Sequence, residues 1–303
     1  MPISKPDDTK KRRLNVLVYI SVAPQSFDHE VDNTTIEERA AAFRALHSAP
    51  EIFLLPNAWD VTSALVLEQA GFSAIATTSA GIGYSFGYPV GQEMPRADML
   101  AVLSRITERV FCPLSADMEA GYGDTPDAVA ETVRLTWQTG TIGINLEDRT
   151  YDKDAPLIET QLAVERIRAA REAAPLMVIN ARTDGYFTGG SGENVFADTV
   201  KRANLFREAG ADCLFIPGTK DPEIIRQLVA EIDGPLNIMG GVGYPDVAAL
   251  AALGVKRVTV GASMARAAYA KLVQFADEFK SAGTYEFADD GESHAAMNAI
   301  LSN

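Results

Sequence analysis

Short apolar runs alternate with longer segments in which apolar residues recur every three or four positions. The runs are typical of buried strands, and the longer segments are typical of amphipathic helices. Eight such runs start near residues 52, 74, 112, 142, 176, 213, 235 and 257. Strands that alternate strictly with helices pair in parallel through right-handed crossovers. We therefore predict an α/β protein with the architecture of a (β/α)8 TIM barrel rather than an open sheet.

Residues typical of helix ends support this order of elements. Four predicted strands follow a helix that a glycine closes, at Gly71, Gly140, Gly210 and Gly254. Glycine just past a helix is a common stop signal. Asp60 is a plausible N-cap, and either Asp124 or Thr125 caps the helix that opens with Pro126.

The pattern changes at both ends of the chain. Residues 1–33 contain a basic cluster, a short apolar run and an acidic stretch, and we expect a poorly ordered extension there rather than a targeting segment. Residues 34–303 are predicted to be a single barrel domain that includes an extra C-terminal helical segment. No run approaches the roughly 18 apolar residues of a membrane span, so no membrane partner is expected.

Composition and charge narrow the classes of function. The chain of 303 residues is 47% hydrophobic and carries a net charge of −14, which argues against nucleic acid as a partner. Its two cysteines, Cys112 and Cys213, predict no disulfide framework and fit a reducing, cytoplasmic setting. No histidine lies between Ser48 and Ser293, so we expect chemistry based on carboxylates rather than imidazole.

Acidic residues stand at the ends of two predicted strands. Asp117 and Glu119 follow one strand in the stretch SADMEAGYGD, and Glu147 ends the next strand. Positions i and i+2 of a strand face the same side, so the first two acids are predicted to share one space. Carboxylate oxygens are the ligands that hard divalent cations prefer. We therefore predict a metal site for Mg²⁺ or, in its place, Mn²⁺.

Other candidate groups lie at the same end of the predicted barrel. Arg182, after the following strand, can hold a carboxylate through two parallel hydrogen bonds. A turn after an earlier strand presents backbone N–H groups suited to an anionic oxygen, at Ser79, Ala80 and Gly81. The loop of residues 148–158 is placed to act as a lid. It carries candidate catalytic side chains at Arg149, Tyr151 and Lys153.

Five stretches together resemble the isocitrate lyase/phosphoenolpyruvate mutase superfamily: LPNAWD, TTSAGIGYSFGYPVGQ, ADMEAGYG, GINLED and INARTD. The resemblance runs from about residue 54 to residue 265. It implies a barrel that binds a small 2-oxo acid or dicarboxylate and depends on Mg²⁺. It also implies cleavage of a C–C or C–P bond next to the carbonyl through an enolate-like intermediate. A homo-oligomer, a dimer or tetramer with exchanged C-terminal helices, is implied as well.

The resemblance also implies a role for each matching residue. The metal site is implied at Asp117, Glu119 and Glu147. Substrate binding is implied at Trp59, Ser79, Ala80, Gly81, Arg182 and Asn237. Together with the loop analysis this gives a candidate catalytic set of Arg182, Glu147 and Tyr151.

Three departures from the family pattern limit the reaction. Family lyases for isocitrate and 2-methylisocitrate carry a K-[KR]-C-G-H loop, but the loop here reads DRTYDKDAPLIE and lacks cysteine. Val90 stands where many members have an Asp, and Pro217–Gly218 replaces a Glu or His. Cleavage of methylisocitrate is therefore disfavoured. A non-catalytic 2-oxo acid binder and a phosphate-binding biosynthetic barrel remain alternatives.

Overall fold

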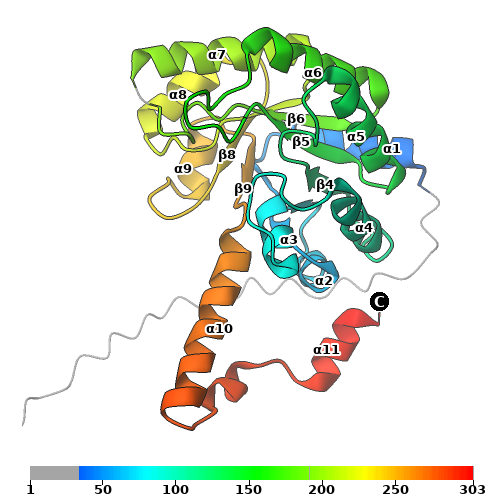
Figure 1. The fold of residues 1–303 in the computed structure, drawn as a ribbon, viewed down its shortest axis with the longest axis vertical. Coiled ribbons are helices and arrows are strands. Elements are labelled where there is room, and N and C mark those ends of the chain that lie inside the picture. The colour runs from blue at the N-terminus through cyan, green and yellow to red at the C-terminus, as the bar shows by residue number, and fades with distance from the viewer. Residues whose placement is uncertain (1–33, 191, 303) are drawn as a thin grey trace, which may run out of the picture. The chain divides into compact units, whose positions relative to one another are not determined.

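Nine short parallel strands form one curled sheet, with helices arranged around it (Figure 1). The computed structural model describes residues 34–190 and 192–302, so the extension predicted for residues 1–33 lies outside the described residues. The strands are β1 (Phe53–Leu54), β2 (Asn57–Ala58), β3 (Ile75–Thr77), β4 (Leu114–Asp117), β5 (Gly143–Glu147), β6 (Val178–Arg182), β7 (Cys213–Phe215), β8 (Leu236–Met239) and β9 (Arg257–Thr259).

Helices alternate with these strands along the chain. They are α1 (Ile36–Leu46), α2 (Val61–Gln69), α3 (Ser79–Phe86), α4 (Arg96–Thr107), α5 (Pro126–Gln138), α6 (Thr160–Ala173), α7 (Glu193–Glu208), α8 (Pro222–Glu231), α9 (Val247–Ala252), α10 (Ser263–Ser281) and α11 (His294–Leu301). A short 3₁₀ helix, η1 (Glu286–Asp290), separates the last two.

The sheet closes through a first strand that is split in two. β1 pairs with β9, β2 pairs with β3, and only Leu55 and Pro56 separate β1 from β2. Pro56 has no N–H to donate, yet its carbonyl oxygen accepts from the Ala76 amide at 2.8 Å. The Leu55 amide donates to the Val258 carbonyl at 2.9 Å. The predicted eight-stranded barrel is therefore confirmed, with its first strand interrupted.

The predicted helix ends are also confirmed. Asp60 caps α2 by accepting from the Ser63 amide at 2.7 Å, and Thr125 rather than Asp124 caps α5. The four glycines predicted to stop helices all adopt a left-handed backbone, with φ values of 86°, 84°, 111° and 92° at Gly71, Gly140, Gly210 and Gly254.

Helix α1 covers the end of the barrel at which the strands begin. Phe43 and His47 pack edge-on against each other and against Phe53, the first residue of β1. A Cβ on Gly143, the first residue of β5, would come within 2.6 Å of the Phe43 ring, so glycine leaves room for that ring. The opposite end of the barrel, where the strands finish, is therefore the end expected to hold an active site.

The C-terminal helices differ from those that cover the barrel. Helix α10 runs away from the barrel (Figure 1), and of its 19 residues only Ala265 is buried. Helix α11 packs against α2 and is the extra C-terminal helix that the sequence predicts. Among the helices of the described residues, none combines the length and apolar character that crossing a membrane requires.

Candidate active site

The three predicted metal-site acids lie at the carboxyl ends of β4 and β5. Asp117 ends β4 and Glu147 ends β5, as the sequence predicts. Glu119 lies beyond the strand, where a left-handed backbone (φ 49°) turns its side chain. The prediction that strand alternation would turn Asp117 and Glu119 to the same side was therefore wrong, because the strand ends before Glu119. A strained turn, not strand periodicity, brings the two acids into one electrostatic environment.

Asp117 is held by hydrogen bonds from the start of α3 and from β5. Its Oδ2 accepts from the Ser79 amide at 3.0 Å and from Ser79 Oγ at 2.8 Å, and its Oδ1 accepts from Asn145 Nδ2 at 3.1 Å. The predicted anion-binding turn is thus the first turn of a helix. One of its amides is already used by Asp117, and the Gly81 amide donates to Thr78 Oγ1 at 3.3 Å. The Ala80 amide is the one left for a ligand.

Glu119 is buried and held by backbone amides. Its Oε2 accepts from the Gly91 and Gln92 amides at 3.0 and 2.9 Å. Burial and the charge of Asp117 raise the pKa of Glu119, while these hydrogen bonds oppose the shift. Val90, at the position where the family pattern has an Asp, is 47% exposed and adds no charge to this group of acids.

Tyr151 stands between two of the acids. Its Oη lies 2.8 Å from Glu119 Oε2 and 2.8 Å from Glu147 Oε1. A phenol has one hydrogen and can donate to only one of them, so both short contacts require a proton on one of the two carboxyls. Burial and the charge of Glu147 raise the pKa of Tyr151, which keeps the phenol protonated.

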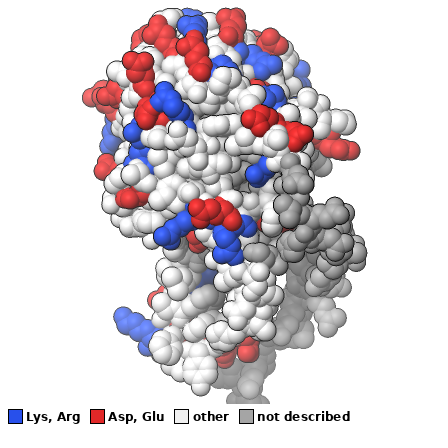
Figure 2. Space-filling model, turned by 90° about the vertical axis from the view of Figure 1, so that its right-hand side faces the viewer, with Lys and Arg blue, Asp and Glu red and all other residues white. Residues whose placement is uncertain are grey.

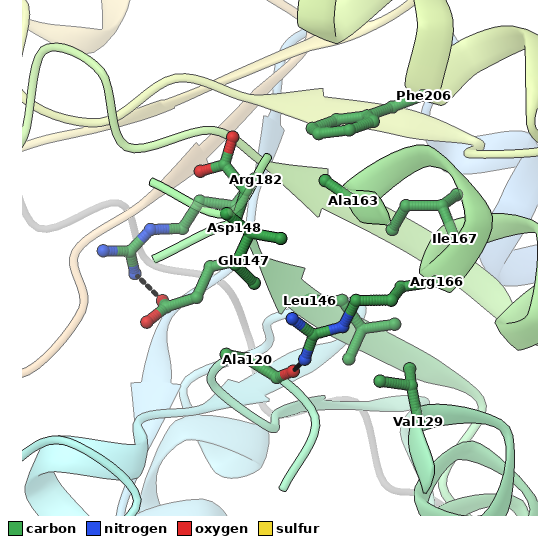
Figure 3. Close-up of a pocket in the computed structure, with 11 residues that line it drawn as sticks. Ala120, Val129, Leu146, Glu147, Asp148, Ala163, Arg166, Ile167, Arg182 and Phe206 are labelled. Carbon is green, nitrogen blue, oxygen red and sulfur yellow. Dashed lines mark hydrogen bonds and ion pairs between the residues drawn. The ribbon is translucent and has the colours of Figure 1, made fainter. Parts of the chain in front are cut away.

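Glu147 forms a buried ion pair with Arg182 on the neighbouring strand. Figure 3 shows the two side chains pointing toward each other, and Arg182 Nη1 lies 3.0 Å from Glu147 Oε2. Burial raises the pKa of Glu147 to about 8, although the charge of Arg182 opposes the shift. Arg182 also holds Asp184 through two contacts, Nε to Oδ1 at 2.5 Å and Nη2 to Oδ2 at 2.8 Å. One guanidinium therefore contacts two buried carboxyl groups.

The acids fit a hard divalent cation by their chemistry. They are oxygen donors, and burial together with neighbouring negative charge raises the pKa of Glu119 and Glu147, a cost that a cation would relieve. Within residues 34–190 and 192–302, no three acidic, histidine or cysteine side chains are grouped closely enough to bind one ion. The Tyr151 hydroxyl occupies the space between Glu119 and Glu147 instead.

The loop of residues 148–158 is fastened at its base. The Ile158 amide donates to the Asp148 carbonyl at 2.7 Å, so the two ends of the loop meet. Arg202 Nη1 donates to the Ile158 carbonyl at 2.8 Å and lies 3.3 Å from Asp148 Oδ2. Burial raises the pKa of Asp148 to about 6, against the charge of Arg202. Arg202 on α7 thus sets the position from which Tyr151 reaches the acids.

A second arginine supports the loop that carries Glu119. Arg166 on α6 donates to the carbonyl oxygens of Ala120 and Gly123. Figure 3 shows this contact beside a cavity of about 10 Å³, with Ala163, Ile167 and Phe206 on its apolar side. The buried guanidinium of Arg166 therefore holds the left-handed turn at Glu119 in place.

Aromatic rings and guanidinium groups alternate across the top of the site. Arg149 lies 4.5 Å from the centre of the Tyr151 ring and 5.5 Å from that of Phe187. Arg182 lies 4.9 Å from the Phe187 ring and 5.5 Å from the Phe215 ring. These stacked contacts link the loop after β5 to the loop after β6.

The departure at Pro217–Gly218 has a structural reason. Gly218 has a left-handed backbone (φ 97°), and a Cβ there would come within 2.6 Å of the Phe187 amide nitrogen. The missing side chain therefore lets the loop that carries Phe187 lie directly over β7.

The remaining predicted residues line or support the barrel mouth. Asn237 is fully buried and borders the same internal cavity as Asp117 and Arg182. Trp59 packs against α3, where a Cβ on Gly81 would come within 2.9 Å of the Trp59 Cβ. The two cysteines are free, and burial raises the pKa of Cys213 to about 12.

Several supporting residues escaped the sequence analysis. Asp184 belongs to the stretch INARTD, but nothing in its spacing indicates that it would hold Arg182. Arg166 and Arg202 look like ordinary polar positions of amphipathic helices. Buried arginines within helices are a detectable signal only once the helix face is known.

The fold and site define a class of protein: an α/β barrel with buried carboxylates and an arginine at the carboxyl ends of its strands. The sequence profile described as phosphoenolpyruvate phosphomutase matches residues 43–280, and the chain belongs to this family. Its relatives are lyases and mutases of the isocitrate lyase/phosphoenolpyruvate mutase superfamily.

Three comparisons illustrate the relationship. A crystal structure of a putative lyase/mutase from Burkholderia cenocepacia J2315 has a TM-score of 0.83 and 38% identity, covering 88% of this chain and 97% of that one. The crystal structure of phosphonopyruvate hydrolase in complex with oxalate and Mg²⁺ has a TM-score of 0.78 and 26% identity, covering 87% of this chain and 95% of that one. The 2-methylisocitrate lyase of Bacillus subtilis (strain 168) is 30% identical over 66% of each chain.

The fastening of the loop gives a testable prediction. In Arg202→Met, Asp148 loses its buried partner, and we expect the free energy of unfolding to fall by about 3 kcal/mol. Trypsin should also cut the native variant faster after Arg149 and Lys153, as peptide mass spectrometry would show.

Arg226→Met is the matched control, because it removes an exposed arginine paired with Glu223 on α8. Trypsin should cut the loop of this control at the wild-type rate, and its free energy of unfolding should equal that of the wild type. If Arg202→Met is cut within the loop no faster than this control, Arg202 does not hold the loop.

Proposed function

We propose that the chain is a Mg²⁺-dependent lyase that breaks the bond next to the carbonyl of a small 2-oxo acid. Oxaloacetate-like decarboxylation and phosphonopyruvate-type C–P cleavage are the two reactions that this proposal covers. The observation that carries it is the placement of Asp117, Glu119 and Glu147 beside Arg182 at one end of a barrel. A reducing, cytoplasmic setting is part of the proposal, since both cysteines are free.

Asp117, Glu119 and Glu147 are the residues that would hold a divalent cation, Mg²⁺ or Mn²⁺. When bound, such a cation supplies positive charge for an oxygen that becomes negative as the bond breaks. The displacement of Tyr151 from between Glu119 and Glu147 would accompany binding, because the cation needs the same oxygens.

Arg182 is suited to hold the substrate carboxylate. A guanidinium has five N–H groups, and three are used by Glu147 and Asp184. The remaining two, one on each Nη, can bind a carboxylate, and the Phe187 and Phe215 rings keep the guanidinium plane in place. The Ala80 amide at the start of α3 is a further donor for an anionic oxygen.

Tyr151 and Glu147 are the candidate groups for proton transfer. In a decarboxylation the electron pair of the broken C–C bond passes to the carbonyl oxygen, and a proton must then reach the carbon. The Tyr151 Oη proton is the candidate donor. Before a cation binds, Glu147 Oε1 lies 2.8 Å from this hydroxyl and holds it at the site, and after proton transfer the phenol would regain its proton from solvent.

The metal requirement is tested with Asp117→Asn. This change keeps the size of the side chain but removes the charge of one of the three acids. We expect Mg²⁺-dependent release of pyruvate from oxaloacetate or phosphonopyruvate to fall about 10²–10³-fold, by analogy with the loss of an electrostatic contact in a buried site.

Asp246→Asn is the control, because Asp246 caps α9 and asparagine is an equally good N-cap. Its turnover should equal that of the wild type. Turnover by Asp117→Asn at the wild-type rate, with EDTA present, would contradict the metal assignment. Binding of pyruvate without turnover of any 2-oxo acid would favour the non-catalytic binder instead.

The absence of a loop cysteine gives a second prediction. Lysis of methylisocitrate needs a proton donor for the departing carbon. Cys112 precedes β4, and Cys213 begins β7, so neither reaches the strand ends where the acids lie. Loss of a general acid reduces rates by about 10²–10⁴. We therefore expect kcat/KM for methylisocitrate at least about a hundredfold below that for the best 2-oxo acid. Comparable values, from steady-state assays, would show that the cysteine is dispensable.

We also propose a homo-oligomer, a dimer or tetramer, that uses α10. Tyr269, Leu272, Val273 and Phe279 lie on one face of this helix and are 36–64% exposed. In Figure 2 the part of the surface at the level of α10 carries few charges, whereas charged side chains crowd the upper part. An exposed apolar face of this kind is typical of an interface.

The assembly is tested by introducing two charges, Leu272→Glu with Val273→Glu. We expect the wild type to sediment as a dimer or tetramer and the variant as a monomer, by analytical ultracentrifugation. Lys271→Glu, on the opposite face of α10, should assemble like the wild type. A monomeric wild type at tens of micromolar would overturn the proposal.

A further inference from the structure

Arg149 stands at the rim of the candidate active site, and the proposed function leaves it without a role. It follows Asp148 directly after β5, the strand that ends in Glu147, and it is half-buried. Within residues 34–190 and 192–302, its guanidinium contacts two aromatic rings but makes no hydrogen bond or ion pair. Its five N–H groups are therefore available for an anionic ligand.

The base of the loop holds Arg149 in place. Its backbone forms an antiparallel bridge with Leu157, so it lies in the fastened part of the loop and not at the exposed tip. The centre of the Tyr151 ring lies 4.5 Å from the guanidinium. The hydroxyl of that ring contacts Glu119 and Glu147. One aromatic ring thus separates Arg149 from the acids that would hold the cation.

Phe187 links Arg149 to the second arginine of the site. The centre of its ring is 5.5 Å from the Arg149 guanidinium and 4.9 Å from that of Arg182. Arg182 is the group proposed to hold the substrate carboxylate. Two guanidinium groups that contact one ring are close enough to bind the two ends of a small dianion. Because the ring restricts both side chains, little of their conformational entropy is lost on binding.

The two reactions covered by the proposed function differ in what happens to the charge of the departing group. In decarboxylation the C–C bond breaks, its electron pair passes to the carbonyl oxygen, and a proton then joins the carbon. The departing carboxylate leaves as neutral CO₂. A cation that holds this carboxylate stabilises the reactant more than the transition state, and it therefore slows the reaction.

Cleavage of a C–P bond by water keeps the negative charge on the departing group. The electron pair of the C–P bond passes to the carbonyl oxygen, and the oxygen of the water joins phosphorus. One proton of that water ends on the carbon and the other on the phosphate. The phosphoryl oxygens stay negative throughout, so a cation that holds them remains favourable in the transition state.

We propose that Arg149 binds the second anionic group of the substrate and makes the site selective for a phosphonate over a carboxylate at that position. The inference rests on the proposed function and decides between the two reactions that it covers. Arg182 holds the carboxylate next to the carbonyl, and Arg149 holds the group that departs.

The first test measures binding by isothermal titration calorimetry with Mg²⁺ present. It compares sulfopyruvate, in which a sulfonate replaces the phosphonate, with pyruvate, which has one anionic group. In Arg149→Met we expect the affinity for sulfopyruvate to fall roughly tenfold to a hundredfold, because charge-assisted hydrogen bonds are lost. The affinity for pyruvate should stay at the wild-type value. Arg149→Lys keeps the charge without the planar fork, so its affinity for sulfopyruvate should lie between the two.

The second test compares the steady-state turnover of phosphonopyruvate and oxaloacetate. We expect the wild type to have the higher kcat/KM for phosphonopyruvate. In Arg149→Met this value should fall roughly tenfold to a hundredfold, whereas for oxaloacetate KM should rise and kcat should not fall. Arg226→Met on the surface should match the wild type with both substrates. A merely structural role for Arg149 would lower kcat for both substrates alike.

Three results would overturn the assignment: a higher wild-type kcat/KM for oxaloacetate, an equal loss of kcat for both substrates in Arg149→Met, or an unchanged affinity of that variant for sulfopyruvate. A wild type that turns over neither substrate would contradict the proposed function instead. The calorimetric comparison would then decide by itself whether Arg149 binds the second anionic group.

Discussion

The crowding of buried negative charge at one end of the barrel governs the structure around it. Asp117, Glu119, Glu147 and Asp184 end neighbouring strands or follow them, and Arg182 is the guanidinium that pairs with two of them. Like charges in a low-dielectric setting repel strongly. The loops respond by turning donors inward: the Ser79 hydroxyl and amide, and the Gly91 and Gln92 amides. The loop geometry of the site is thus a consequence of its charge.

The same constraint explains the unusual backbone at the rim. Non-glycine residues with left-handed φ values occur at Gln92, Glu119, Tyr122 and Tyr151, all on loops around the acids. Such conformations cost about 1–3 kcal/mol each and persist where surrounding contacts determine them. Arg166 and Arg202 provide those contacts from α6 and α7. Strain at the rim is therefore balanced by buried arginines on the helices.

Periodicity and cap chemistry were enough to predict the strands, the helix stops and the order of the barrel. Those signals are local, so Asp60 and the glycines that close four of the helices could be identified without tertiary information. The predicted strand ends also gave the correct positions of Asp117, Glu147 and Arg182, because neighbouring parallel strands end at the same edge of the sheet. The left-handed turn at Glu119, the position of Tyr151 between two acids, and the aromatic contacts of Arg149 depend on residues far apart in sequence. No window of the chain contains the contacts that fix them.

The split first strand has a consequence for how the chain folds. Asn57 joins the two edges of the sheet: its Nδ2 donates to the Thr77 carbonyl, and its Oδ1 accepts from the Val260 and Gly261 amides, more than 200 positions later. Loops of this length close slowly, because their entropy is lost before any contact forms. During synthesis the first strand therefore emerges with half of its partners still unmade. Until β9 has formed, β1 has no partner strand and β2 is an exposed edge of the sheet.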